Sequence, residues 1–110
     1  MALNPEPYAL TQPARADIDA LSGAAVVEFG TSWCGICRAA QPAIEGALER
    51  HPAIRHLKIQ DGPGRPLGRS YGIKLWPTLV FLRDGVEVGR LVRPRERRAI
   101  EQELSALDTA

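Results

Sequence analysis

The stretch Thr31–Cys37, with the sequence TSWCGIC, contains both cysteines of this 110-residue chain. Two residues separate the cysteines, and in the reducing cytoplasm such a C-x-x-C pair is typical of a catalytic dithiol or of half a metal site. A third interpretation is that both thiols are buried and unreactive. Which interpretation applies depends on the sequence around the pair.

The composition indicates one ordinary globular domain. A chain of 110 residues can bury a core without disulfide staples, and a formal net charge of +1 gives no global field for nucleic acid or a membrane surface. The N-terminus shows no signal-peptide pattern, and no apolar run approaches the roughly 18 residues of a membrane-spanning helix. We therefore expect a cytoplasmic monomer without nucleic-acid or membrane partners. Residues 1–7 are expected to be a flexible lead-in and residues 8–110 the domain.

The apolar patterning predicts alternating strands and helices. Asp84-Gly85 is a strong hairpin signal, and Pro42 lies inside the helix that begins at the cysteines, where it is expected to cause a kink. The expected strands are 8–10, 24–29, 54–59, 78–82 and 86–92, and the expected helices are 13–21, 34–48, a short piece before Tyr71-Gly72, and one that opens at Pro94. The order βαβαβαββα predicts an α/β fold with a central mixed sheet flanked by helices.

Several landmarks along the chain resemble the thioredoxin family. The residues WCGIC at 33–37 are similar to the family's active-site box, and Pro42 stands five residues after the second cysteine. The run YGIKLWPTLVFLRDG at 71–85 resembles the segment that carries the family's cis-proline, here Pro77. Glu28 matches the family's buried acid, and Lys58 its lysine on the third strand. The resemblance extends from about residue 8 to residue 108 and implies a thioredoxin fold.

The resemblance also implies an activity, the exchange of dithiol for disulfide on protein substrates. No prosthetic cofactor is expected, and a thioredoxin-reductase-type flavoenzyme would recycle the oxidised form. Cys34 is the expected nucleophile, because N–H groups and the dipole at a helix N-terminus favour a thiolate. Cys37 lies one turn later on the same helix face and is expected to resolve the mixed disulfide.

Glu28 and Lys58 complete the expected catalytic residues. Burial should raise the pKa of the Glu28 carboxyl, which could then accept or return the proton of Cys37. Lys58 would give electrostatic support. The alternative is that Glu28 only pairs with Lys58 or lies at a strand edge.

The expected substrate-binding residues surround the box. By the resemblance, a cis Pro77 exposes the backbone of Trp76, so that an extended substrate segment can pair there. The full set is Trp33, Gly35, Ile36, Trp76, Pro77 and Arg93.

Four positions depart from the family's pattern. Ile36 replaces a proline, and because the residues between the cysteines tune the reduction potential, the direction of electron flow stays open. Gly30 stands where the family often has tryptophan, and Trp76 where a smaller aliphatic residue is usual. We expect the Trp76 indole to cover the surface that Gly30 leaves open. Arg93 stands near a glycine of the family's docking groove, where it should narrow the groove and favour an acidic partner.

Two other classes of protein stay open. Cys34, Cys37, His51 and His56 satisfy a loose Cys2His2 zinc pattern. Pro52 restricts helical continuation after His51, and His56 falls in a strand pattern, so the context opposes a zinc finger. The other class is a thioredoxin-fold binding module or chaperone whose cysteines are incidental.

Overall fold

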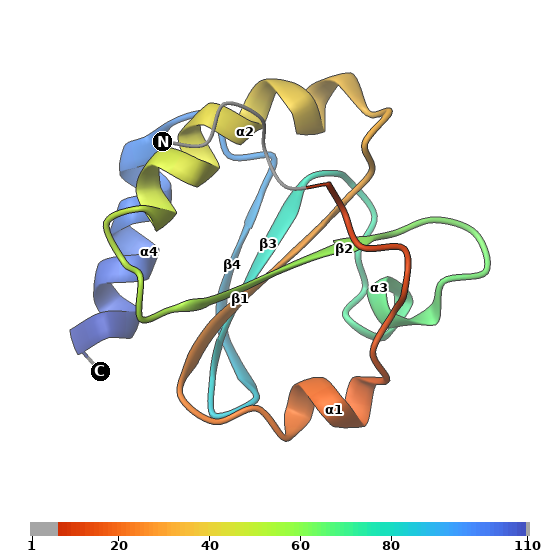
Figure 1. The fold of residues 1–110 in the computed structure, drawn as a ribbon, viewed down its shortest axis with the longest axis horizontal. Helices are drawn as coiled ribbons and strands as arrows, with labels where there is room; N and C mark the ends of the chain where they lie inside the picture. Colours follow the sequence, from red (N-terminus) through yellow and green to blue (C-terminus); the bar gives the residue numbers. More distant parts are fainter. Residues whose placement is uncertain (1–6, 110) are drawn as a thin grey trace.

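The computed structural model describes residues 7–109, so most of the expected flexible lead-in lies outside the described residues. The chain forms α1 (Arg15–Asp19), β1 (Ala24–Gly30), α2 (Gly35–Leu48), β2 (Arg55–Gln60), α3 (Pro66–Ser70), β3 (Thr78–Arg83), β4 (Val86–Val92) and α4 (Arg97–Thr109). The strands make one mixed sheet in the order β2-β1-β3-β4 (Figure 1). The predicted α/β class is therefore confirmed.

β1 lies inside the sheet, parallel to β2 and antiparallel to β3. β3 and β4 form the predicted hairpin, whose turn has Asp84 at φ 49° and Gly85 at φ 79°. Positive φ at both central residues is the geometry that Asp-Gly favours in a two-residue turn. β1 is also buried from residue 25 to residue 30, so a polar side chain on it must find its partners inside the protein.

The expected strand at 8–10 is reduced to a single parallel bridge between Ala9 and Ile59. The Ala9 N–H donates to the Lys58 carbonyl at 2.8 Å, and the Gln60 N–H donates to the Ala9 carbonyl at 3.0 Å. Pro7 has no N–H with which to continue this ladder. The bridge nonetheless fixes the neighbouring residue, Tyr8, against the edge of β2.

Two helices, α1 and α4, differ from the sequence prediction at their ends. α1 is shorter than the expected 13–21, and α4 begins at Arg97 rather than at Pro94. Arg93 has φ 51°, so the chain turns there before the helix can start. α2 continues through Pro42.

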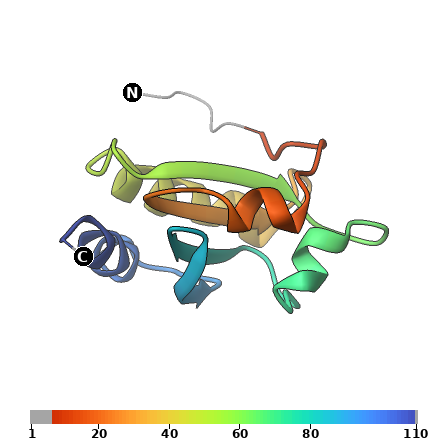
Figure 2. The same cartoon turned by 90° about the horizontal axis from the view of Figure 1, so that it is seen from below.

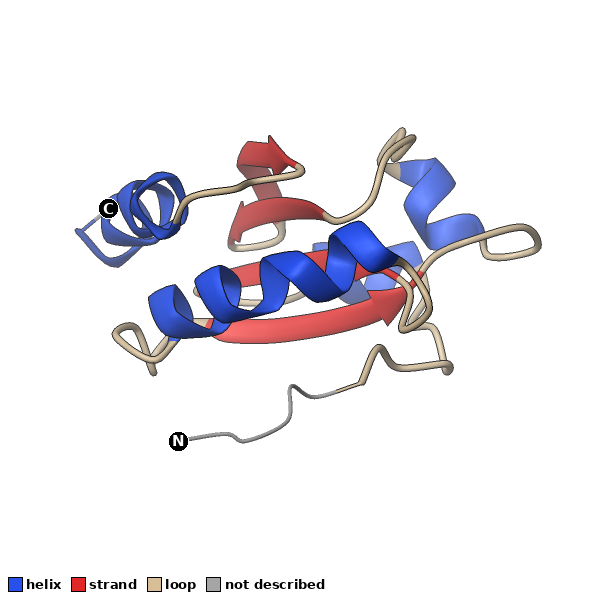
Figure 3. Cartoon of the chain, turned by 90° about the horizontal axis from the view of Figure 1, so that it is seen from above, coloured by secondary structure: helices blue, strands red, loops and turns tan. Residues whose placement is uncertain are grey.

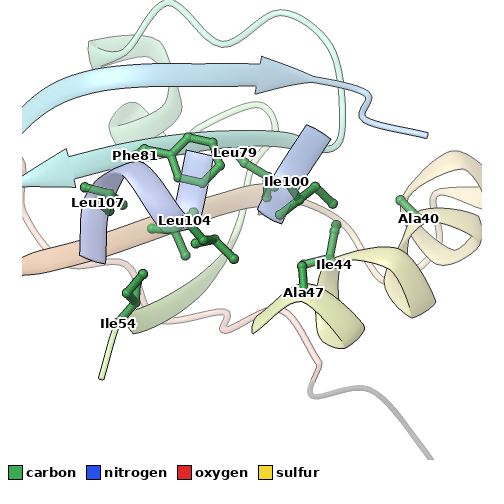
Figure 4. Packing of buried hydrophobic residues seen from close by; sticks show 10 residues of the cluster. Ala40, Ile44, Ala47, Ile54, Leu79, Phe81, Ile100, Leu104 and Leu107 are labelled. Carbon is green, nitrogen blue, oxygen red and sulfur yellow. The ribbon is translucent and has the colours of Figure 1, made fainter. Parts of the chain in front are cut away.

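The helices cover both faces of the sheet. Figures 2 and 3 view the sheet from opposite sides, with α1 in front in one view and α2 in front in the other. One face carries the cluster drawn in Figure 4, in which side chains of α2, α4 and β3 interlock; its members include Ile44, Leu79, Phe81, Ile100, Leu104 and Leu107. Each fully buried Leu or Ile in such a cluster stabilises the fold by about 1.5–3 kcal/mol.

Alternation along the strands decides which residues face α2. Val27 and Phe29 of β1 pack on the α1 and α3 side, whereas Val26 packs on the α2 side. Because side chains alternate along a strand, Glu28 shares the α2 side with Val26. Glu28 is in register with Lys58 of β2. The sheet therefore presents a carboxylate and a lysine to the helix that begins at the cysteines.

No helix within residues 7–109 is both long and apolar enough to cross a membrane.

Candidate active site

The two cysteines lie at the start of α2. Cys34 is the N-cap residue, and its Sγ accepts a hydrogen bond from the Cys37 N–H at 3.2 Å. Cys34 is half-buried, Cys37 is fully buried, and both are free thiols. Helix N–H groups and the helix dipole stabilise an anion at this position. The arrangement suits an attacking Cys34 with Cys37 behind it.

Exposed apolar side chains surround Cys34. Trp33 is 70% exposed and Ile36 is 46% exposed. The Trp33 ring meets the Trp76 ring edge to face, with 5.7 Å between centroids and 82° between planes. Beyond the box, a groove is lined by Ile36, Ala39, Ala40, Arg93, Pro94 and Arg95. A partner that docks at Cys34 would meet an apolar rim and then positive charge.

The peptide bond between Trp76 and Pro77 is cis, as the resemblance implies. The Trp76 carbonyl, however, accepts a hydrogen bond from Arg93 Nε at 2.8 Å, and the Arg93 N–H donates to the Pro77 carbonyl at 2.8 Å. The Trp76 backbone, which we expected to be exposed to substrate, therefore has its carbonyl occupied by Arg93. Arg93 can reach it because its positive φ turns the chain back toward Pro77.

The space beside Gly30 is filled by Tyr8, so the expectation that Trp76 covers it is wrong. A Cβ atom added to Gly30 would lie 2.7 Å from both Cζ and Oη of Tyr8 and 2.9 Å from Cys37 Sγ. Trp76 is held elsewhere, since its Nε1 donates to Asp61 Oδ2 at 2.9 Å. The missing side chain thus creates an interior space for a tyrosine next to the buried cysteine.

Glu28 is fully buried beneath α2 and has several hydrogen-bond donors. Its Oε2 accepts from the Tyr8 hydroxyl and, at 2.8 Å, from Gln41 Nε2. Its Oε1 lies 2.8 Å from His56 Nε2. Lys58 Nζ donates to Gln41 Oε1 at 2.8 Å. Glu28 is therefore the centre of a buried polar network and does not lie at a strand edge.

The pKa of Glu28 is lowered, contrary to the expectation from burial. Burial is the largest single influence and by itself raises this pKa. The hydrogen bond and charge of His56, together with hydrogen bonds from Tyr8 and Gln41, outweigh it. A carboxylate that accepts several hydrogen bonds is stabilised in its charged form. Glu28 is therefore stabilised as a carboxylate anion, which is the form that can accept a proton.

The pKa of the Cys37 thiol is raised to about 12. Burial is the main cause, and the neighbouring Cys34 adds to it, whereas the Thr31 backbone and the Tyr8 hydroxyl act in the opposite direction. Cys37 is thus a neutral thiol near pH 7, and it needs an acceptor for its proton before it can attack.

Three residues of this network were not among the sequence candidates for catalysis: Tyr8, Gln41 and His56. Gln41 lies four residues after Cys37 on a buried helix face, and His56 lies two residues before Lys58 on the same face of β2. Both spacings could have identified them. Nothing local to Tyr8 indicates its place, which depends on the distant bridge between Ala9 and Ile59.

The zinc pattern is not assembled. His51 Nδ1 is paired with Asp108 Oδ2, and His56 is bound to Glu28. Within residues 7–109, no three or more His, Cys, Asp or Glu side chains are grouped closely enough to hold a metal ion. The two histidines lie on different segments, since His51 follows the end of α2 and His56 lies on β2.

Comparisons with known proteins agree with this geometry. The family model described as Thioredoxin matches residues 11–106. A thioredoxin of Chlamydia muridarum is 32% identical over 85 residues, which cover 76% of this chain and 82% of that protein. The H-type 1 thioredoxin of Nicotiana tabacum is 34% identical over 67 residues, 61% of this chain and 53% of that protein, so the chain spans about half of that relative's length.

A solved structure is similar along nearly the whole chain. Thioredoxin 2 from Pseudomonas aeruginosa PAO1, in its reduced form, has a TM-score of 0.84 and 51% identity, covering 93% of this chain and 94% of that one. The family model also spans the Cys34–Cys37 pair and Pro77. The fold, the WCGIC box and the sequence comparisons all agree, and the chain therefore belongs to the thioredoxin family.

Proposed function

We propose that this chain is a thiol–disulfide oxidoreductase that reduces disulfides of protein substrates through Cys34 and Cys37. The observation that carries the proposal is the pairing of a half-buried N-cap thiol with a fully buried thiol one turn later. Thiol–disulfide exchange needs one accessible attacking sulfur and a second that resolves the intermediate.

The reaction starts at Cys34. Its thiolate attacks one sulfur of the substrate disulfide, so that a Cys34–substrate bond forms and the substrate S–S bond breaks. The first substrate thiolate leaves and takes up a proton from solvent. Cys37 then loses its proton and attacks Cys34 Sγ, which forms the Cys34–Cys37 disulfide and releases the second substrate thiolate. Two electrons pass from the dithiol to the substrate.

Glu28 is the proposed acceptor of the Cys37 proton, and Lys58 supports the carboxylate network through Gln41. A positioned acid or base of this kind contributes about 10²–10⁴-fold to rate. Trp33, Gly35 and Ile36 would contact substrate beside Cys34. Trp76, Pro77 and Arg93 would form the opposite side of the docking surface, with Arg93 favouring an acidic partner.

We also propose the biological setting. The protein acts as a monomeric reductant in the cytoplasm, where a structural disulfide would not persist and a dithiol stays reduced. A thioredoxin-reductase-type flavoenzyme returns electrons to the Cys34–Cys37 disulfide. Ile36 lies between the cysteines, so the reduction potential of the pair, measured against glutathione, tests the direction of flow.

Catalysed reduction of insulin by dithiothreitol tests the activity. The wild type should accelerate precipitation of the insulin chains, Cys34→Ser should abolish the acceleration, and Ser32→Ala, a change at the exposed neighbouring hydroxyl, should retain it. A wild type no faster than Cys34→Ser would leave a binding module or chaperone as the function. Cys37→Ser should accumulate a stable mixed disulfide through Cys34, visible by mass spectrometry.

A further inference from the structure

The resolving step requires a route by which the Cys37 proton can reach solvent. Cys37 is fully buried, and its proton must leave before it can attack Cys34. Glu28 is fully buried too, so a proton that reaches this carboxylate still has to reach solvent. The question is which groups connect the two buried residues to each other and to water.

Tyr8 stands between Cys37 and Glu28. A Cβ atom added to Gly30 would lie 2.7 Å from Tyr8 Oη and 2.9 Å from Cys37 Sγ. The hydroxyl and the thiol therefore face the same small space. The Tyr8 hydroxyl donates to Glu28 Oε2 and accepts from Gln41 Nε2 at 3.2 Å. A hydroxyl can donate one proton while it accepts another. Tyr8 is therefore oriented to pass a proton from sulfur to carboxylate.

His56 connects Glu28 to the surface. Its Nε2 lies 2.8 Å from Glu28 Oε1, on the opposite carboxylate oxygen from the one that Tyr8 uses. The His56 side chain is 24% exposed, whereas that of Glu28 is not exposed at all. An imidazole has two ring nitrogens, so one can take up a proton while the other releases one to water. The carboxylate thus has one oxygen toward the cysteine and the other toward solvent.

We propose that Tyr8, Glu28 and His56 form a proton path that carries the Cys37 proton to solvent during the resolving step. The inference rests on the proposed oxidoreductase function. As Cys37 Sγ attacks Cys34 Sγ, the Cys37 proton passes to Tyr8 Oη while the Tyr8 proton passes to Glu28 Oε2. Tyr8 ends neutral, Glu28 becomes a carboxylic acid, and the Cys34–Cys37 bond replaces the bond to substrate. The carboxyl group then turns its O–H toward His56 and gives the proton to an unprotonated His56 Nε2, while His56 releases a proton from Nδ1 to water.

Gly30 is the residue that makes the path possible. Any Cβ at this position would lie closer than 3.0 Å to both Tyr8 and Cys37, so one of them would have to move. Two further charged or titratable groups lie beside the path, Cys34 next to Cys37 and Lys58 next to Tyr8. Lys58 Nζ lies 4.6 Å from the Tyr8 ring centroid and donates to Gln41. Lys58 therefore faces the path without forming one of its proposed proton-transfer steps.

A two-phase experiment separates the steps of the reaction. Reduced protein is mixed with one equivalent of 5,5′-dithiobis(2-nitrobenzoate), whose two coloured thiolates are released in turn. The first phase reports attack by Cys34 and the second reports resolution by Cys37. Tyr8→Phe keeps the ring and removes the hydroxyl. We expect it to slow the second phase by about 10²-fold and to leave the first within about twofold.

Tyr71→Phe is the matched control. The Tyr71 ring is buried against Phe29 on the other face of the sheet, away from α2. Both phases should keep the wild-type rate. A second phase in Tyr8→Phe as fast as in Tyr71→Phe would overturn the proton path. A wild type with no Cys34-dependent first phase would instead overturn the oxidoreductase function itself.

A double-variant cycle distinguishes a path from a merely structural role. If Tyr8 and Glu28 act in series, Tyr8→Phe combined with Glu28→Gln should be no slower than Glu28→Gln alone. If the two substitutions acted independently through structure, their decreases in the rate of the second phase would multiply. That result would overturn the proton path.

His56→Ala tests the exit at a partly exposed position, even where a change at Tyr8 prevents folding. Because the proton leaves Glu28 after the Cys34–Cys37 bond forms, the second phase should keep its rate. Proton release, followed with a pH-indicator dye in weakly buffered solution, should coincide with the second phase in the wild type and lag behind it in His56→Ala. Proton release without a lag in this variant would overturn the role of His56.

Discussion

Arg93 Nε donates a 2.8 Å hydrogen bond to the carbonyl of Trp76, the residue that precedes the cis-proline. The same arginine has φ 51°, a conformation that costs a residue with a side chain about 1–2 kcal/mol. The backbone at Arg93 is therefore strained, and its side chain makes a hydrogen bond with Trp76 that occupies one edge of the docking surface. A protein substrate that pairs with this backbone must displace the guanidinium.

Arg93→Gly should improve the use of protein disulfides. Glycine relieves the positive φ and frees the Trp76 carbonyl, so we expect the KM for insulin to fall several-fold while the reaction with a small aromatic disulfide is unchanged. The free energy of unfolding should stay within about 1 kcal/mol, because the relief of strain offsets a lost hydrogen bond. Arg95→Gly removes a charge from the same groove and is the control. Equal KM changes in both variants would mean that charge alone, and not the Trp76 contact, limits binding.

The two cysteines should differ sharply in alkylation. Cys34 is accessible at a helix N-terminus, whereas Cys37 is fully buried and has its pKa raised to about 12. Near pH 7, iodoacetamide should modify the thiol of Cys37→Ser at least about 10²-fold faster than that of Cys34→Ser, since only the thiolate reacts. Mass spectrometry of timed samples measures both rates. Similar rates would contradict the assignment of Cys34 as the nucleophile.

Glu28 should make the folded protein sensitive to acid. Its pKa is lowered in the folded state, so its contribution to stability is present above the unfolded value of about 4.3 and is lost as the pH falls through the folded value. At pH 7, Glu28→Gln should cost about 1–3 kcal/mol of unfolding free energy, because the donors around it lose a charged acceptor. Below pH 4 the difference should shrink.

Denaturant unfolding at several pH values measures this effect. Glu96→Gln, at an exposed position before α4, should follow the wild-type curve. A Glu28→Gln curve parallel to the wild type from pH 7 to pH 3 would argue against a stabilised Glu28 anion.

Gly30→Ala should destabilise the protein at its active site. The new methyl group would overlap Tyr8 and Cys37 Sγ, and overpacking of this kind costs about 1–3 kcal/mol. Gly35→Ala is the control, because a Cβ there meets nothing within 4 Å and alanine favours the first turn of α2. Thermal unfolding should therefore show a lower Tm for the first variant and an equal or higher Tm for the second. Equal Tm values would mean that Tyr8 can move aside freely.

The sequence was sufficient for the parts of the fold that depend on local patterning. The apolar run of β3, the Asp84-Gly85 turn and the residues of β4 were all predicted within a residue. The cysteine pair and its place at a helix start followed from spacing alone. Such features are predictable because the deciding residues are neighbours along the chain.

The parts that were missed depend on contacts between distant segments. The sign of the Glu28 pKa shift could not follow from burial alone, because three donors from three different segments reverse it. Gly30 was interpreted as an opening at the surface, whereas it faces inward toward a tyrosine 22 positions earlier in the sequence. Neither fact has a local signature.

The bridge between Ala9 and Ile59 has a consequence for how this protein is compared and handled. It anchors Tyr8 within the active site, yet Tyr8 precedes residue 11, where the match to the family model begins. A side chain of the buried network thus lies outside the region that the family model matches. A truncation designed on the shared region would keep every hallmark of the family and still remove a side chain that contacts the buried carboxylate.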